Sequence, residues 1–409
     1  MKAFFNVKTL DQVLAYLTYF EPVGKETITL STGLHRISAT NSVADVNLPD
    51  FSRSTMDGYA VCAVSTFGAS EGNPAYLTLK PSTRMGTPPT YSIAPGEAAR
   101  ISTGGMLPKG ADSVVMVEHA EAIDEVTLEV YKSVAPGQHV IEAGEDIKKG
   151  EIILKQGQRL RPQEIGLLAA FGHEHIVVYK KPVVTIISTG DEIVPINQVP
   201  RMAQIRDVNT YTLSSLLEKS GAIPQIMGIV SDDFDALYDV CFRALRISDM
   251  VLLSGGSSVG TRDFSIAALS HLPECDILVH GIAISPGKPT ILAQSEGKAF
   301  WGLPGHVVSA MIVFEVVVKS FIEHISGLNT KSETACKHTA LLSRNISSAQ
   351  GRTDFIRVRL VVKDGCCWAE PILGKSGLIH TMVKADGLIK IDQHNEGLEK
   401  GTLVEVIPI

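Results

Sequence analysis

The chain of 409 residues has few cysteines, no excess of positive charge and no long apolar run. Its six cysteines are scattered without a C-x-x-C pair, so neither a zinc site nor a disulfide framework is expected. The 37 basic and 44 acidic residues give a net charge of −7, which offers no attractive surface to nucleic acid or to an anionic membrane. The most apolar stretch, residues 307–318, is too short to cross a bilayer. We therefore expect a cytoplasmic protein with reduced thiols.

The length and composition indicate a globular protein of several domains. A chain of 409 residues exceeds the size at which one hydrophobic core stops growing, so about two to four domains are expected. Hydrophobic residues make up 44% and charged residues 20%, which are the proportions of ordinary globular proteins. An acidic chain can still bind a phosphorylated substrate, but only through a local pocket of amides and cations or through a metal ion.

The hydrophobic patterns divide the chain into three parts after a short first helix, which begins with a capping box at Thr9. Between residues 45 and 145, short β-rich runs alternate with Gly/Pro turns and predict a small all-β domain. From about residue 177 to 330, apolar strands alternate with helices, which predicts a parallel sheet covered on both faces. The last part is again β-like, with a hairpin turn at Asp364-Gly365. The strands expected in the sheet are residues 183–188, 226–230, 250–254 and 300–303, and the helices are residues 210–220, 232–246 and 307–325.

Acidic residues occupy several turns of the predicted domains. Asp57 stands at the start of the β domain and Asp146 in an acidic turn at its end, and either can cap a turn without a further role. Asp191 and Glu192 directly follow the first strand of the sheet, where ligands bind in open α/β proteins. Because adjacent carboxylates repel each other, this pair indicates a compensating cation or hydrogen-bond donors. Asp232 follows another strand, and the simplest interpretation of it is the N-cap of the next helix.

A glycine-rich loop, Ser254-Gly-Gly-Ser-Ser-Val-Gly260, joins a strand to an expected helix. Backbone amides in such a loop can bind an anion at the helix N-terminus. The loop has neither the dinucleotide pattern G-x-G-x-x-G nor the Lys-Ser/Thr that ends a P-loop, so it favours an anion or phosphate ester without a nucleotide signature. A purely structural turn is the alternative. The candidate phosphate-binding residues are Gly255, Gly256, Ser257, Ser258 and Gly260.

Two further loops carry groups suited to an oxyanion. Lys288 lies on a turn that prolines on both sides make rigid, which favours holding one cation in place. Ser309 follows a junction between a strand and a helix, and its hydroxyl and the backbone amides there can face an oxyanion. We interpret His306, in the same junction, as a cap or a surface residue. One edge of the predicted sheet thus combines carboxylates that suit Mg²⁺ with amides and a lysine that suit phosphate, which favours metal-assisted chemistry on a phosphorylated substrate.

These motifs, taken in order, resemble the MoeA family, which includes the E domain of gephyrin and of the plant molybdenum insertase. The resemblance covers essentially the whole chain, through residues 351–355 and 374–378 near its end. The seven motifs are Met56-Asp57-Gly58-Tyr59-Ala60, Thr103-Gly104-Gly105, Gly144-Glu145-Asp146, Ser188-Thr-Gly-Asp-Glu192, Ser254-Gly-Gly-Ser-Ser-Val-Gly260, Pro286-Gly-Lys-Pro289 and Gly302-Leu-Pro-Gly305.

The resemblance implies a protomer of four domains that forms an elongated homodimer. The central α/β domain would be similar to the molybdopterin adenylyltransferase MogA, with a small β domain inserted in the chain and a β-barrel-like domain at its C-terminus. Carried over by residue number, the MogA-like domain is 1–21 with 177–330, the inserted β domain is 45–145, a linking α/β domain is 22–44 with 146–176, and the C-terminal domain is 331–409.

The resemblance also implies a reaction in which molybdate and adenylylated molybdopterin give the molybdenum cofactor and AMP, with Mg²⁺ required. The glycine-rich loop would hold the phosphate end of the pterin, and Lys288 and Ser309 would bind molybdate. A MogA-like protein would be a transient partner that hands over the substrate. The implied catalytic carboxylates are Asp57, Asp146, Glu192, Asp232 and Asp263, of which Glu192 and Asp263 would hold the metal.

The chain departs from the family pattern at the expected oxyanion site. Ser285 stands where a lysine is common in the family, and Gly281 stands where some members carry lysine. His306 and Val307 replace Asn-Pro of the family pattern Gly-Asn-Pro-Val-Ser. Two alternatives remain, which are adenylyl transfer to molybdopterin, as in MogA, and a non-enzymatic scaffold of the gephyrin type. MogA-type chains lack the inserted β domain and the C-terminal domain, and a scaffold is expected to lose the acidic residues that are all present here.

Overall fold

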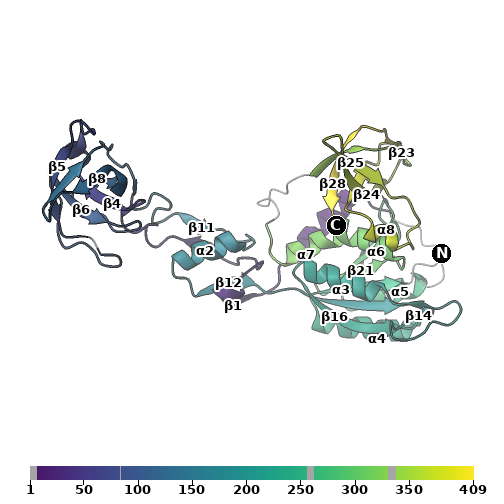
Figure 1. Cartoon of the computed structure of the whole chain (residues 1–409). Helices are drawn as coiled ribbons and strands as arrows, with labels where there is room; N and C mark the ends of the chain where they lie inside the picture. The colour runs from purple at the N-terminus through teal and green to yellow at the C-terminus, as the bar shows by residue number, and fades with distance from the viewer. Residues whose placement is uncertain (1–6, 83, 256–261, 330–337) are drawn as a thin grey trace. The chain divides into compact units, whose positions relative to one another are not determined.

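The chain forms two compact units in a computed structural model, which describes residues 7–82, 84–255, 262–329 and 338–409 without the side chains of residues 262 and 263 (Figure 1). The large unit comprises residues 1–40, 156–165 and 174–409, and the β unit comprises residues 41–155 and 166–173. The helix α2 (Pro162–Ala170) begins in the large unit and ends in the β unit.

The β unit is built on a six-stranded sheet, as the alternation of β-rich runs and turns predicts. The strand order is β7-β4-β6-β5-β9-β8, in which β5 and β6 pair in parallel and the other neighbours pair antiparallel. Leu77, Leu128 and Val130 are fully or almost fully buried in its core. The strands are β4 (Gly58–Val61), β5 (Ala75–Lys80), β6 (Glu97–Ile101), β7 (Ser113–Met116), β8 (Ala120–Ala122) and β9 (Thr127–Val130).

The large unit contains a second six-stranded sheet, in which an antiparallel pair extends four parallel strands. The strand order is β16-β13-β17-β21-β20-β18. The four expected strands are confirmed, whereas β20 (Ile291–Ser295) and β18 (Asp276–His280) are additional. Glu296 and Gly297 both have positive φ, and their two-residue turn joins β20 to β21, which gives the sheet an antiparallel edge. The parallel strands are β13 (Val183–Thr189), β16 (Ile223–Val230), β17 (Met250–Gly255) and β21 (Lys298–Leu303).

Helices cover both faces of this sheet. On one face, α3 and the continuous segment from α6 to α7 pack on strand residues such as Leu252 and Trp301. On the other face, α4 and α5 pack on Val251 and Phe300. Successive residues of a strand point to opposite faces, which is why the strands are apolar throughout. The helices are α3 (Asn209–Lys219), α4 (Phe234–Ile247), α5 (Arg262–Ser270), α6 (Val307–Val313), the π-helical η5 (Phe314–Val318) and α7 (Lys319–Ile325).

The first helix has the expected capping box, because Thr9 and Gln12 bond reciprocally to each other's backbone N–H. The helix α1 (Leu10–Leu14) is short and continues as the 3-10 helix η1 (Ala15–Tyr19). Within the described residues, no helix combines the length and the apolar character needed to span a membrane.

The C-terminal part of the large unit is a closed five-stranded barrel, as expected. Its strands pair in the order β24-β25-β22-β28-β26, and β26 closes the barrel on β24. The predicted hairpin turn is confirmed, because Asp364 and Gly365 have φ of 52° and 73° between β24 and β25. The short strand β19 (Ile284–Ser285) of the α/β part pairs with β24 and ties the barrel to the loop that carries Lys288. The barrel strands are β22 (His338–Leu342), β24 (Thr353–Lys363), β25 (Cys366–Pro371), β26 (Gly387–Ile391) and β28 (Leu403–Pro408).

Candidate functional site

The carboxyl ends of the parallel strands meet at one edge of the sheet, where close backbone approaches require glycine. Gly255 ends β17 with φ of 128°, and a Cβ on it would lie 1.9 Å from the carbonyl oxygen of Thr189. Gly190 follows β13 with φ of 147°, and a Cβ there would lie 2.9 Å from a carboxylate oxygen of Glu192. The two loops therefore pack backbone to backbone, and the Glu192 carboxylate folds back over Gly190.

Three carboxylates from two strand ends occupy this edge, namely Asp191 and Glu192 after β13 and Asp232 after β16. The carboxylate of Asp232 accepts a hydrogen bond of 2.6 Å from the Thr189 hydroxyl, and its backbone N–H donates to Asp191 at 3.3 Å. Asp191 and Glu192 are exposed and Asp232 is half-buried. The interpretation of Asp232 as a helix cap is wrong, because the neighbouring Asp233 is the N-cap of α4 and accepts from a backbone N–H of the first turn. The Asp232 carboxylate instead faces the end of β13.

Most of the glycine-rich loop lies outside the described residues. Gly256, Ser257, Ser258 and Gly260 belong to this part of the chain, so their phosphate contacts stay predictions. Asp263 belongs to the first turn of α5, but its side chain is also outside the description.

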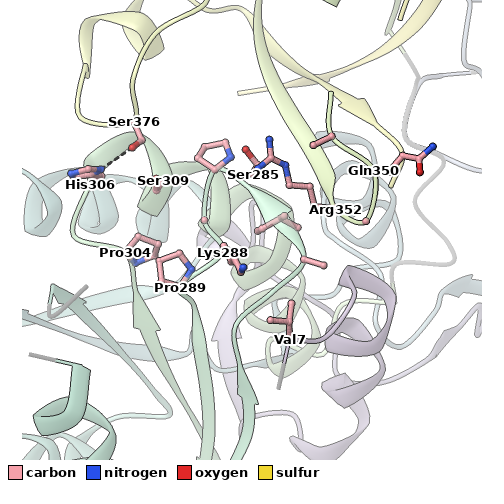
Figure 2. Close-up of a pocket in the computed structure, with 16 residues that line it drawn as sticks. Val7, Ser285, Lys288, Pro289, Pro304, His306, Ser309, Gln350, Arg352 and Ser376 are labelled. Carbon is pink, nitrogen blue, oxygen red and sulfur yellow. Dashed lines mark hydrogen bonds between the residues drawn. The ribbon is translucent and has the colours of Figure 1, made fainter. Parts of the chain in front are cut away.

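Lys288 and Ser309 line one cavity of about 610 Å³ in the large unit, where the α/β part meets the C-terminal barrel. Figure 2 shows His306 and Ser376 on one side of this cavity, Arg352 on the other side and Lys288 between them. Two cations, Lys288 and Arg352, and three serines, Ser285, Ser309 and Ser376, thus line a common space. We call it the oxyanion cavity.

The turn that carries Lys288 is fixed by its packing on α6. Gly287 has φ of 116°, and a Cβ on it would lie 2.4 Å from the side chain of Val313. The hydroxyl of Thr290 donates to the Gly287 carbonyl at 2.7 Å and closes the turn. Lys288 itself is exposed, and no described residue pairs with its ammonium group. Its charge is therefore available to a ligand.

Arg352 is a cavity residue that sequence reasoning did not find. The parallel pairing of β19 with β24, which places Ser285 opposite Asp354, brings the start of the barrel to the cavity. The Nε of Arg352 donates to the buried carboxylate of Asp354 at 2.8 Å, and 46% of the arginine side chain stays exposed. The only sign of Arg352 in the sequence was that it belongs to the motif at residues 351–355. The position of this motif in the sequence does not predict a contact with the Lys288 turn.

Ser376 is the second such residue, and it joins the barrel to the start of α6. Its Oγ lies 2.7 Å from Nδ1 of His306, and its carbonyl accepts from the backbone N–H of Val308 at 3.1 Å. His306 is the N-cap residue of α6 and is exposed, as expected, but the bond to Ser376 gives it a place in the cavity wall. The motif at residues 374–378 carried the family resemblance without indicating this contact.

A second cavity, of about 350 Å³, shares His306 with the oxyanion cavity. Its walls come from β14 (Ile193–Val194), β15 (Ile205–Arg206), the start of α3 and the loop after β21. The Nδ2 of Asn209 donates to the hydroxyl of Ser254 at 2.7 Å and to the Gly305 carbonyl at 2.9 Å. These bonds tie the start of the glycine-rich loop to the loop that carries His306. Asn209 thus joins the end of β17 to the loop between the two cavities.

In the β unit, Asp57 joins two of the sequence motifs. Its exposed carboxylate accepts hydrogen bonds from the backbone N–H of Thr103 at 2.7 Å and from the Thr103 hydroxyl at 3.1 Å. These two donors, the backbone N–H first, hold the pKa of Asp57 below its ordinary value. Gly58 can carry no side chain, because a Cβ would lie 1.9 Å from the carbonyl oxygen of Val115. The Met-Asp-Gly-Tyr and Thr-Gly-Gly motifs thus form one local structure.

Asp146 lies in an exposed turn of the β unit, after β10 (Val140–Ile141). Its backbone N–H donates to the carbonyl of Leu48 at 3.2 Å. Asp57 and Asp146 both belong to the β unit, whereas the other predicted site residues belong to the large unit. The predicted set of catalytic residues is therefore divided between the two units.

Three family models match the chain in sequence order. Residues 8–172 match the MoeA N-terminal region (domain I and II). Residues 185–324 match a domain described as a probable molybdopterin binding domain. Residues 339–409 match the MoeA C-terminal region (domain IV).

Relatives match over nearly the full length of the chain. A protein of Methanocaldococcus jannaschii that is named for molybdopterin biosynthesis is 38% identical over 382 residues, which are 91% of this chain and 89% of that protein. The molybdopterin molybdenumtransferase of Bacillus subtilis is 31% identical over 405 residues, which are 98% of this chain and 94% of the relative. The crystal structure of a molybdopterin biosynthesis MoeA protein from Pyrococcus horikoshii superposes with a TM-score of 0.82 at 35% identity and covers 98% of this chain and 99% of that one.

Proposed function

The chain belongs to the MoeA family of molybdenum cofactor biosynthesis, and on that premise we propose that it inserts molybdate into adenylylated molybdopterin and releases AMP. Two relatives that match 98% of this chain are named molybdopterin molybdenumtransferase, and the chain is such an enzyme. In the proposed reaction, the two dithiolene sulfurs replace two oxo groups of molybdate, which take up protons and leave as water, and hydrolysis of the pyrophosphate bond by one water frees AMP. The site must therefore hold an oxyanion, a pyrophosphate and a pterin near one another.

The oxyanion cavity carries this proposal. Molybdate is a tetrahedral dianion, and it needs cations and N–H or O–H donors on several sides. Lys288 and Arg352 supply the charge, and Ser309 and Ser376 supply hydroxyls, in a protein whose net charge is −7. A cavity with two cations in an acidic protein favours a small anion as its ligand.

The carboxylate edge suits the pyrophosphate through Mg²⁺. The described residues contain no group of three His, Cys, Asp or Glu side chains that could hold a metal ion. Mg²⁺ does not need such a group, because it is usually bound by one or two carboxylates together with substrate phosphates. Glu192 and Asp263 would hold the ion, and the hydroxyl of Thr189 orients the carboxylate of Asp232 at the end of β13. When bound, Mg²⁺ would reduce the negative charge on the pyrophosphate and on the leaving AMP.

The proposal extends to the assembly and to its surroundings. We propose a cytoplasmic homodimer in which Asp57 of one protomer acts on a site that contains Glu192 and Asp263 of the other, and a MogA-like protein that supplies the adenylylated substrate. The five cysteines in the described residues are free thiols, as a reducing compartment favours.

The direct test measures AMP release from adenylylated molybdopterin with and without molybdate and Mg²⁺. The proposed enzyme releases AMP only when both are present. Full release in excess chelator would refute the metal role. Release of pyrophosphate from ATP and molybdopterin, without AMP release, would identify an adenylyltransferase instead.

A further inference from the structure

The cavity beside the oxyanion cavity is a slot with mostly apolar walls and a volume of about 350 Å³. Two buried polar residues, Asp207 and Asn209, line it at the start of α3. No residue predicted to bind substrate or metal lies in this slot. The apolar walls are Ile193, Pro200, Ile205, Val208 and Val307.

Asn209 holds a buried acceptor without a partner. Only 7% of this residue is exposed, and its Oδ1 accepts no hydrogen bond from the described residues. Its Nδ2 donates to the Ser254 hydroxyl and to the Gly305 carbonyl. Because a carbonyl can only accept, the amide nitrogen must face Gly305, and this fixes Oδ1 as the unpartnered atom. Buried polar atoms are nearly always hydrogen-bonded, so Oδ1 indicates a place where a ligand donates.

Asp207 is not equivalent to Asn209, although it lines the same slot. Its two carboxylate oxygens accept from Thr210, one from the backbone N–H at 3.1 Å and the other from the hydroxyl at 2.6 Å. These bonds satisfy donors at the start of α3. Both oxygens of Asp207 thus have a partner, whereas Oδ1 of Asn209 has none among the described residues, which makes Asn209 the acceptor that most needs a ligand N–H group.

We propose that this slot binds the pterin ring of the substrate, with Oδ1 of Asn209 accepting a hydrogen bond from the aminopyrimidinone edge. The proposal rests on the proposed function, which supplies a substrate that contains a pterin. A pterin is flat and bicyclic, so its faces suit a lining that includes apolar residues such as Ile193 and Val307, and its edge carries N–H donors.

The substrate contains a second flat ring with N–H donors, the adenine of its adenylyl group. The dithiolene that receives molybdenum belongs to the ring fused to the pterin, whereas adenine lies beyond the pyrophosphate. The slot shares His306 with the cavity that holds Lys288. A heterocycle bound next to the oxyanion cavity is therefore the one close to the dithiolene, which is the pterin.

The test compares three probes, 6-hydroxymethylpterin, AMP and molybdate, in calorimetric or fluorescence titrations of the full chain. Asn209→Ala removes the acceptor, and Val208→Phe fills the slot while leaving the Asn209 amide in place. Each variant should weaken the binding of 6-hydroxymethylpterin by about tenfold or more and leave the binding of AMP and of molybdate unchanged. The reason is that the lost hydrogen bond, or the filled cavity, affects only the ring that binds in the slot.

A control variant separates binding from folding. Tyr211→Trp adds bulk on α3 at an exposed position outside the slot. It should bind 6-hydroxymethylpterin like the unmodified chain. Val208→Phe keeps the proposal testable if Asn209→Ala lowers the melting temperature.

Three results overturn the pterin assignment. The first is no saturable binding of 6-hydroxymethylpterin to the unmodified chain. The second is binding of 6-hydroxymethylpterin by Asn209→Ala and Val208→Phe that is as tight as in the unmodified chain. The third is a selective loss of AMP binding in these variants, which would assign the slot to adenine. The outcome is independent of the reaction. If the unmodified chain releases AMP but all variants bind 6-hydroxymethylpterin equally well, only this inference is refuted. If the variants show the expected loss of pterin binding but the unmodified chain has no turnover, only the proposed function is refuted.

Discussion

Removal of the Lys288 ammonium group should weaken the binding of molybdate far more than the binding of the adenylylated pterin. Arg352 is paired with Asp354, whereas no described residue neutralises Lys288. Lys288 is therefore the cation of the oxyanion cavity whose charge is available to a ligand. A charge-assisted hydrogen bond contributes about 1.5–3 kcal/mol, so Lys288→Ala should raise the molybdate requirement by roughly ten- to hundredfold.

The assay measures initial rates of AMP release, first with varied molybdate at saturating adenylylated molybdopterin and then in the reverse arrangement. Lys288→Arg keeps a positive charge and should recover part of the loss. Lys390→Ala removes another exposed lysine of the large unit that does not line the cavity, and it should change neither KM. Because Lys288 is exposed, the effect of Lys288→Ala should also shrink as the salt concentration rises.

The two possible failures have different meanings. Equal weakening of molybdate and of the adenylylated pterin would reassign Lys288 to the phosphate of the pterin. A Lys288→Ala enzyme with an unchanged molybdate requirement would remove the oxyanion assignment of the cavity, since no other unpaired cation among the described residues lines it.

Three further predictions concern the carboxylates. Glu192→Gln should abolish AMP release and leave the melting temperature nearly unchanged, because Glu192 is exposed; a large fall in melting temperature would indicate a structural role. Thr103→Val removes one of the two donors to Asp57, so NMR titration should show its pKa rising toward the ordinary value. The pKa is lowered in the folded chain, so Asp57 stays ionised at neutral pH, and its contribution to stability is lost only as pH falls through the lowered pKa. Mixed dimers of Asp57→Ala and Asp263→Ala chains should regain about half of the activity per dimer if each site uses both protomers, and persistent inactivity would place each site within one chain.

Much of the fold could be predicted because its elements carry local signals. The capping box at Thr9 and the turn at Asp364-Gly365 are fixed by a few neighbouring residues, and both are confirmed. The antiparallel strands β18 and β20 were missed because a buried strand has the same apolar pattern whatever the direction of its partner. Only the pairing of Ile291 with Gly302 and its neighbours, across the turn at Glu296, sets that direction.

The candidate site could be predicted only where its residues follow strands. Glu192 and Asp232 lie at one edge because parallel strands end together, which is a property of the sheet and not of the loops. Arg352 and Ser376 reach the oxyanion cavity through pairings with residues far away in the chain, such as the pairing of Ser285 with Asp354. No local spacing in the sequence encodes such contacts, so their motifs could be noticed without a role being assigned.

The departures from the family pattern make the dependence on Lys288 stronger. By the family resemblance, Ser285 stands where a lysine is common and Gly281 where some members carry one, and Ser285 lines the oxyanion cavity without a charge. Arg352 replaces only part of this charge, because Asp354 accepts a hydrogen bond from it at 2.8 Å. Coulomb attraction for a dianion adds over the cations that face it. A chain with fewer such cations therefore loses a larger share of its attraction for molybdate when Lys288 is removed than a relative that keeps both lysines.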